Sequence, residues 1–128
     1  MKIGVTAASK GLDAPVDSRF GRCRYFIILD SETTELETVE NASVGASSGA
    51  GIQAAQTLVN KGVNVVITGN IGPNAFQVLS SAGVKVVTGA EGGVRDVVEK
   101  YEKDELKEIS DPTVGGHFGI GGRRGRRR

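Results

Sequence analysis

The stretch that decides the fold is VNVVITGNIGP, residues 63–73. Its apolar run over 63–68 lies between turn signals and predicts a buried central strand. Pro73 suits the first turn of a helix, which we predict over 73–81. A second apolar run over 84–88 predicts another strand. A strand, a helix and a strand in this order predict parallel pairing through a right-handed crossover.

The same patterns extend to both sides of this unit. Apolar residues at helical spacing predict two more helices, and β-branched or alternating segments near the N-terminus predict three more strands. The sequence therefore predicts helices over 51–61, 73–81 and 92–106, and strands over 2–6, 25–30, 35–41, 63–68 and 84–88. This order predicts an α/β fold, a small sandwich with a mixed sheet of about five strands and three helices.

The length and composition of the chain exclude several classes of protein. The chain has 128 residues, which suits one domain. A single cysteine excludes a disulfide framework and an all-cysteine metal cage within one chain. The N-terminus lacks the pattern of a signal peptide, and no apolar run approaches the length of a membrane span, so we expect no membrane segment and a cytoplasmic location.

The net charge of +1 is the sum over two segments of opposite charge. Residues 1–122 hold eleven Lys and Arg against fifteen Asp and Glu, a net charge of −4, whereas residues 123–128 add +5. Residues 115–128 contain six glycines and five arginines. Since this segment has too few apolar residues to offset the entropy of ordering, we predict a domain over 1–109 and a disordered tail over 110–128.

Three arginines at alternate positions surround the only thiol in the segment from Asp17 to Arg24. An extended backbone would place Arg22 and Arg24 on one side and Cys23 on the other. Neighbouring cations lower the pKa of a thiol, and the thiolate ligates soft metals, while arginines pair with anions. The functional interpretation is a site for an anion or a metal cluster. The alternative is a buried small cysteine beside solvated arginines.

Glycine-rich turns precede each predicted helix, over 45–51, 68–73 and 88–93. The carboxyl ends of parallel strands form the usual ligand crevice, and backbone N–H groups at helix starts suit anions. Residues 49–54 match a dinucleotide-binding pattern, but no buried strand directly precedes them and no acidic residue follows at the required distance. The alternative for each loop is an ordinary turn that needs glycine geometry.

Three further features are weaker candidates for a functional site. Asp13, Asp17 and Asp30 could hold Mg²⁺ for phosphoryl transfer if the fold brought them together. His117 is the only histidine, and one imidazole is not a metal site. The arginine-glycine tail could bind nucleic acid through phosphate contacts that depend on salt, or it could serve only solubility.

Taken together, the residues resemble a known family. Its most specific block is Asp17-Ser18-Arg19-Phe20-Gly21-Arg22-Cys23, followed by Phe26 and Asp30; the opening residues 1–5 and segments 51–58, 65–79 and 83–86 complete the match. In order and spacing they are similar to the dinitrogenase iron–molybdenum cofactor biosynthesis family, which includes NifX- and NafY-like proteins and the C-terminal part of NifB-like proteins. The resemblance covers about residues 1–105, and the tail lies outside it.

The resemblance implies a ribonuclease-H-like three-layer sandwich and a non-enzymatic protein that binds or carries iron–molybdenum cofactor or its iron–sulfur precursors. It implies cluster-assembly proteins as partners, in a monomer or a homodimer. Arg19 stands where the family commonly has histidine, and arginine can hold an anionic cluster only electrostatically. The expected site residues are Arg19, Phe20, Gly21, Arg22, Gly69, Asn70, Gly72 and Asn74, with Cys23 as the metal ligand.

Overall fold

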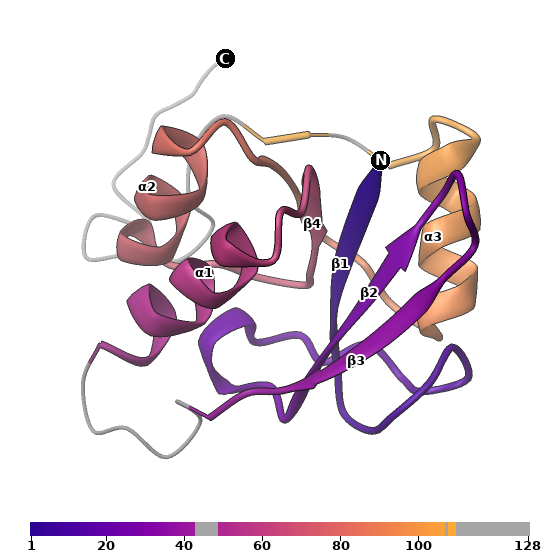
Figure 1. Ribbon diagram of the computed structural model, residues 1–128, viewed down its shortest axis with the longest axis horizontal. Coiled ribbons are helices and arrows are strands. Elements are labelled where there is room, and N and C mark those ends of the chain that lie inside the picture. Colours follow the sequence, from indigo (N-terminus) through magenta and orange to yellow (C-terminus); the bar gives the residue numbers. More distant parts are fainter. Residues whose placement is uncertain (43–48, 107, 110–128) are drawn as a thin grey trace.

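The computed structural model describes residues 1–42, 49–106 and 108–109. The chain runs as β-β-β-α-β-α-β-α, with a short 3₁₀ turn before the second strand (Figure 1). The elements are β1 (Lys2–Ala7), η1 (Phe20–Arg22), β2 (Tyr25–Asp30), β3 (Leu36–Glu40), α1 (Ala50–Asn60), β4 (Val65–Ile67), α2 (Pro73–Ser81), β5 (Lys85–Val87) and α3 (Val94–Glu102).

One mixed sheet carries the fold, with the strand order β3-β2-β1-β4-β5. β2 pairs antiparallel with both β1 and β3, so the strands predicted over 25–30 and 35–41 form a hairpin. β4 pairs parallel with β1 and with β5, as the crossover pattern of residues 63–88 predicted. The five strands and three helices confirm the predicted α/β class.

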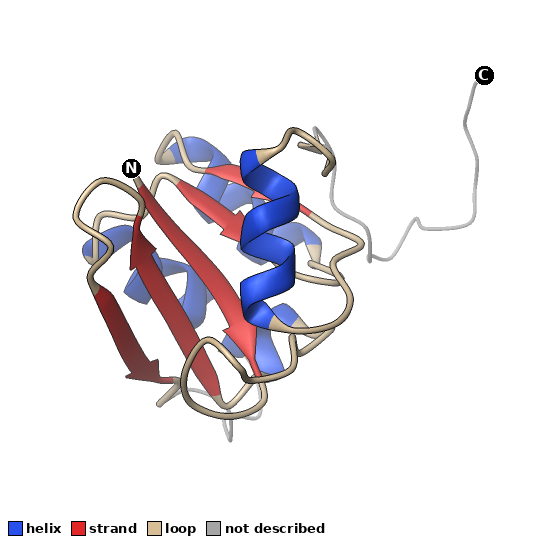
Figure 2. Cartoon of the chain, turned by 90° about the vertical axis from the view of Figure 1, so that its right-hand side faces the viewer, coloured by secondary structure: helices blue, strands red, loops and turns tan. Residues whose placement is uncertain are grey.

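The helices form two layers around this sheet. α1 and α2 lie together on one face and α3 lies on the other, so the predicted three-layer sandwich is confirmed (Figures 1 and 2). Side chains alternate between the two faces along each strand. On β2, Phe26 and Ile28 enter the core beneath α1 and α2, while Ile27 packs in the core beneath α3.

The third helix is shorter than predicted. The sequence pattern predicted 92–106, but α3 spans Val94–Glu102. Asp104 has a φ of 63°, in the left-handed region that ends helices, so the charged continuation leaves the helical path. Beyond the helix, Glu108 bridges to Val87, and the Ile109 N–H donates to the carbonyl of Val86 at 2.8 Å. The predicted disordered tail, 110–128, lies outside the described residues.

The helices in the described ranges are short: α1 has eleven residues, and α2 and α3 have nine each. None of the helices there has the length and apolar character that a bilayer crossing requires.

Candidate functional site

The three parallel strands β1, β4 and β5 end at one edge of the sheet, and the loops that follow them meet there. The Asn70 N–H donates to the carbonyl of Ser18 at 2.7 Å, and the Phe20 N–H donates to the carbonyl of Asn70 at 3.2 Å. The Gly89 N–H donates to the carbonyl of Gly69 at 3.0 Å. These bonds hold the arginine-bearing segment against the loop after β4.

Glycine is required where these two loops approach most closely. A Cβ atom added at Gly69 would lie 2.6 Å from Cα of Ser18 and 2.9 Å from its carbonyl oxygen. No side chain fits at that distance, because the obstructing atoms include backbone. The predicted site residue Gly69 therefore allows this close contact between the loops, and its contact with a ligand stays a prediction.

The turn Phe20–Arg22 packs against the start of α1. A Cβ atom at Gly21 would lie 3.0 Å from both N and Cα of Gly51, so backbone meets backbone here. Phe20 is 3% exposed, and its ring centroid lies 5.8 Å from that of Phe26. The buried ring anchors the turn in the core between the sheet and α1.

A small pocket opens where this turn, the start of α1 and the start of α2 converge. Its volume is about 200 Å³. Four of the predicted site residues line it, and five lining residues were not predicted. The lining residues are Phe20, Gly21, Gly49, Gly51, Ile52, Gly72, Pro73, Asn74 and Ala75. We call this space the ligand pocket. It shows only in the tertiary structure, since no motif links residues 49–52 to Phe20.

The starts of two helices line the ligand pocket. α1 follows Gly49, which has a φ of 73°, and α2 follows Gly72. Within the described part of the chain, neither first turn has a side-chain cap or an acidic residue. The first N–H groups of a helix have no partner in the helix itself, and the helix dipole favours negative charge there. The pocket is therefore suited to an anion.

Arginines lie beside the ligand pocket rather than inside it. The Arg19 backbone N–H donates to Oδ1 of Asp17 at 2.9 Å, and its Nε lies 3.4 Å from the same oxygen. Arg19, Arg22 and Arg24 are all exposed, and Asn70 pairs with Arg19 in a short bridge. The fold thus brings Arg19, Arg22 and Asn70 to the neighbourhood of the pocket, where their charges and dipoles act without being part of its lining.

Cys23 matches the second of the two interpretations of the arginine segment, a small buried cysteine beside exposed arginines. The alternation was right, because Cys23 is fully buried between exposed Arg22 and Arg24. The neutral thiol is favoured, because burial and, to a lesser degree, the charge of Asp17 raise the pKa of Cys23 from 9.0 to about 12. The thiol lies 3.3 Å from the carbonyl oxygen of Phe20, to which it donates. Buried in this way, it is a poor ligand for a metal in the pocket.

Asn41 is a site-forming residue that the sequence did not reveal. It lies just after β3, is 3% exposed, and its side-chain amide donates to the carbonyls of Cys23 at 2.8 Å and Gly21 at 3.3 Å. These bonds hold the middle of the turn Phe20–Arg22 and the residue that follows it. A lone asparagine after a strand has no spacing signal, so only the fold identifies it.

The hypothesis of a magnesium-dependent enzyme is contradicted by the placement of the carboxylates. The Asp17 N–H donates to the carbonyl of Thr6 near the end of β1, whereas Asp30 pairs with Lys2 at its start. About 3.3 Å per residue along β1 separates the two ends by well over 10 Å. Asp13 pairs with Arg95 at 3.2 Å. Among the described residues, no three His, Cys, Asp or Glu side chains gather as a metal site.

Two expectations fall on residues outside the described part of the chain. They are His117 and the arginine-glycine tail with its nucleic-acid alternative. Both stay predictions.

Two solved structures resemble this chain throughout its domain. The apo form of the orange protein from Desulfovibrio gigas matches with a TM-score of 0.84 and 44% identity, over 87% of this chain and 94% of that one. A candidate NifB protein from Thermotoga matches with a TM-score of 0.79 and 36% identity, over 88% and 97% of the two chains.

Sequence comparison agrees with these structural matches. An uncharacterized protein of Methanocaldococcus jannaschii is 29% identical over 103 residues, which are 74% of this chain and 87% of that protein. The family model described as dinitrogenase iron-molybdenum cofactor matches residues 1–104. The resemblance carried by the Asp17–Cys23 block is therefore confirmed, and the chain belongs to the dinitrogenase iron–molybdenum cofactor family.

Proposed function

We propose that this protein is a small, non-enzymatic carrier that binds an iron–molybdenum cofactor-type or iron–sulfur cluster, or a similar anionic ligand, in the ligand pocket. One observation carries the proposal. The starts of α1 and α2, both without side-chain caps in the described residues, share one pocket of about 200 Å³ beside a turn that carries arginines. Helix starts and arginines both favour anions.

The relatives support a cofactor-binding role. The family is described by the iron–molybdenum cofactor of dinitrogenase. The orange protein is described in an apo form, which implies that it also exists with a ligand bound. Because this chain is 44% identical to it over most of its length, we carry the general role of ligand binding across.

The lining of the pocket indicates how a cluster would be held. Among the described residues that line it, none carries a thiol, an imidazole or a carboxylate, and Cys23 is buried with a raised pKa. A cluster bound here would bring its own sulfide ligands and would be held by N–H groups and charge. Such binding exchanges readily, which suits transfer to cluster-assembly proteins. We propose that the protein carries out this role as a monomer or as a homodimer.

The test is anaerobic reconstitution with ferrous iron, molybdate and sulfide, followed by gel filtration, metal analysis and visible absorbance. We expect wild type to retain metal and sulfide in a fixed ratio. Changing Arg19 and Arg22 together to glutamine should reduce the retained metal several-fold, because both lie beside the pocket.

Arg95→Gln is the matched control, since Arg95 pairs with Asp13 beside α3 and away from the pocket. Equal retention by wild type and the Arg19/Arg22 double variant would remove the electrostatic basis of the proposal. A wild type that retains no metal would refute the carrier function itself.

A further inference from the structure

One edge of the sheet, at β3, is open. The strand order places β3 at one end of the sheet and β5 at the other, and Figure 2 shows β3 as the outermost strand. The chain covers its own β5 edge, because Glu108 bridges to Val87. Among the residues that the structure describes, no strand or bridge pairs with the outer side of β3. A further strand can therefore be added at this edge.

The alternation of an antiparallel pair decides which backbone groups of β3 point outward. The Asp30 N–H donates to the carbonyl of Glu35 at 3.0 Å, and the Asn41 N–H donates to the carbonyl of Arg24 at 2.9 Å. Residues that exchange hydrogen bonds alternate with residues that do not, so positions 35, 37, 39 and 41 bond toward β2. The positions between them direct their N–H and C=O groups toward the open edge. These are Leu36, Thr38 and Glu40.

The segment that forms this edge is acidic. Residues 31–41 contain four glutamates and no lysine, arginine or proline. Glu32 pairs with the N-terminal ammonium at 3.1 Å, and Glu37 pairs with Lys61 at 2.6 Å. Glu35 and Glu40 form no ion pair with any residue that the structure describes. The edge therefore keeps negative charge that the fold itself does not neutralise.

A cleft beside the start of β3 offers space for a long side chain. Its volume is about 350 Å³. Its lining residues are Lys2, Ile28, Asp30, Glu35, Leu36 and Glu37. The one ammonium among them already donates to the carbonyl of Lys61 at 3.1 Å. The stem of a lysine or arginine can pack on the apolar side of this cleft while its charged head meets the carboxylates.

We propose that β3 is a docking edge for an extended, lysine- and arginine-rich segment of a partner protein. The backbone of that segment pairs with the outward groups of Leu36, Thr38 and Glu40 and extends the sheet by one strand. Its cations pair with Glu35 and Glu40 across the new strand pair. This surface is separate from the ligand pocket, because none of the residues that line the pocket belongs to β3.

A second copy of this chain is a poorer occupant of the edge. Each copy brings the same four glutamates and no cation in residues 31–41, and like charges on neighbouring strands destabilise their pairing. Residues 1–122 also carry a net charge of −4 in each copy, so the two bodies repel. A basic segment meets neither obstacle.

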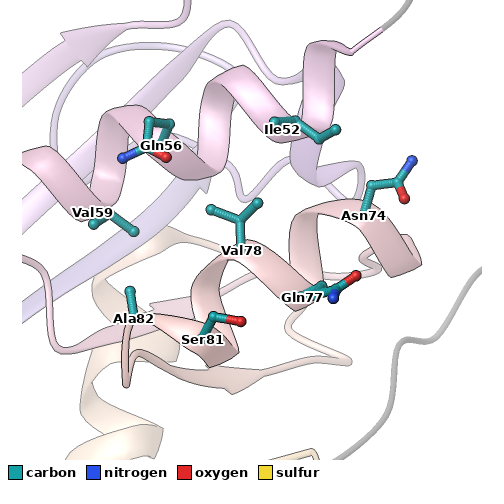
Figure 3. A pocket seen from close by; sticks show the side chains of 8 residues that line it. All are labelled: Ile52, Gln56, Val59, Asn74, Gln77, Val78, Ser81 and Ala82. Atoms are coloured by element: carbon teal, nitrogen blue, oxygen red, sulfur yellow. The ribbon is translucent and has the colours of Figure 1, made fainter.

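The groove between α1 and α2 is the second surface on which a peptide could lie. Its volume is about 490 Å³, and Val78 of α2 points toward Ile52 and Val59 of α1 there (Figure 3). The eight described residues that line it are all uncharged. A basic segment gains no ion pair in this groove, so its amides serve as the comparison in the test.

The first test adds a short synthetic peptide, in which valine or threonine alternates with lysine or arginine, to the full chain. Hydrogen exchange read by NMR reports each backbone amide. We expect the amides of Leu36, Thr38 and Glu40 to exchange about tenfold more slowly with peptide bound, because they gain acceptors. Absence of binding at millimolar peptide overturns the proposal, and so does protection confined to the groove between α1 and α2.

Thr38→Pro tests the backbone pairing. It removes an N–H that points outward, and proline is tolerated on an edge strand where the N–H faces away from the sheet. We expect peptide binding to weaken several-fold, whereas Thr38→Val, which keeps the N–H, should bind as wild type does. A basic peptide interrupted by prolines keeps the charge but cannot pair as a strand. If it binds wild type as well as the uninterrupted peptide does, charge alone causes the binding and the docking edge is wrong.

A charge exchange tests the choice of partner and does not depend on the folding of Thr38→Pro. Changing Glu35 and Glu40 together to lysine should weaken binding of the basic peptide several-fold and favour a peptide with glutamate in place of each cation. Changing the exposed residues Glu99 and Glu102 of α3 to lysine alters the net charge equally and should leave binding unchanged. Equal losses in the two double variants would contradict a site at β3.

Sedimentation of the free protein tests the second copy as occupant. We expect Thr38→Pro to leave the mass in solution unchanged. If wild type is a dimer that Thr38→Pro dissociates, a second copy occupies the edge and the basic partner is wrong. Since these measurements use no metal, their outcome is independent of the proposed carrier function.

Discussion

The side-chain amide of Asn41 donates a 2.8 Å hydrogen bond to the carbonyl oxygen of Cys23. This bond joins the end of β3 to the turn that lines the ligand pocket, across eighteen positions of sequence. Replacing Asn41 with alanine should lower the free energy of unfolding by about 1–3 kcal/mol, because buried carbonyls lose their donor. Urea denaturation measures the change.

Asn60→Ala is the control for that substitution. Asn60 is exposed at the end of α1, so its replacement should change stability by no more than about 0.5 kcal/mol. Equal effects of the two alanine variants would show that Asn41 does not hold the turn.

Gly51→Ala should separate ligand binding from stability. A Cβ at this helical position would lie 3.4 Å from Cβ of Ala75, an acceptable contact, and alanine favours a helix over glycine by up to about 1 kcal/mol. The added methyl projects from a residue that lines the ligand pocket. We therefore expect unchanged or slightly higher stability with several-fold lower metal retention, measured by thermal unfolding and reconstitution.

Gln53→Ala, an exposed change on the same helix, should leave metal retention as in wild type. If Gly51→Ala binds metal fully while remaining folded, the ligand lies elsewhere.

Gly69→Ala should destabilise the whole edge of the sheet where the loops meet. The new Cβ would lie 2.6 Å from Cα of Ser18, so the two loops must separate and the Asn70–Ser18 bond must stretch. Overpacking of this kind costs about 1–3 kcal/mol. Gly93→Ala is the comparison, because its Cβ would come no closer than 3.5 Å to a side-chain oxygen. Denaturation midpoints that fall equally for both would contradict the close-contact argument.

The buried thiol predicts a loss of stability at high pH. Burial raises the pKa of Cys23 from 9.0 to about 12, so above pH 9 the unfolded chain releases a proton that the folded chain keeps. The unfolded state then binds fewer protons, and stability falls as the pH rises from about 9 toward 12, by up to about 1.4 kcal/mol per pH unit. Denaturation across this range measures the slope.

Cys23→Ala removes the titrating group and should flatten that part of the curve by the same amount. If the Cys23→Ala variant loses stability with rising pH as steeply as wild type does, groups other than Cys23 cause the loss. At neutral pH the native thiol should also react slowly with thiol reagents until the protein unfolds.

Much of the fold was readable from local patterns. The apolar run over 63–68 predicted a central strand, because a parallel strand is buried on both faces, and the structure has this strand at Val65–Ile67. Pro73 predicted the start of α2, which begins at that residue. The end of α3 was not readable, since the charged residues after Glu102 suit a helix equally well until Asp104 turns the backbone.

Local patterns along the chain predict the order of the elements, the mixed sheet, the family and the arginine-bearing turn, because each depends on residues near one another in the chain. Three features appear only in the folded protein: the ligand pocket, the burial of Cys23 and the role of Asn41. These depend on contacts between distant segments: Gly21 meets Gly51, and Asn41 holds Cys23, only after the sheet has formed. The arginines around Cys23 are visible in the sequence, but the burial that raises the pKa of its thiol depends on packing.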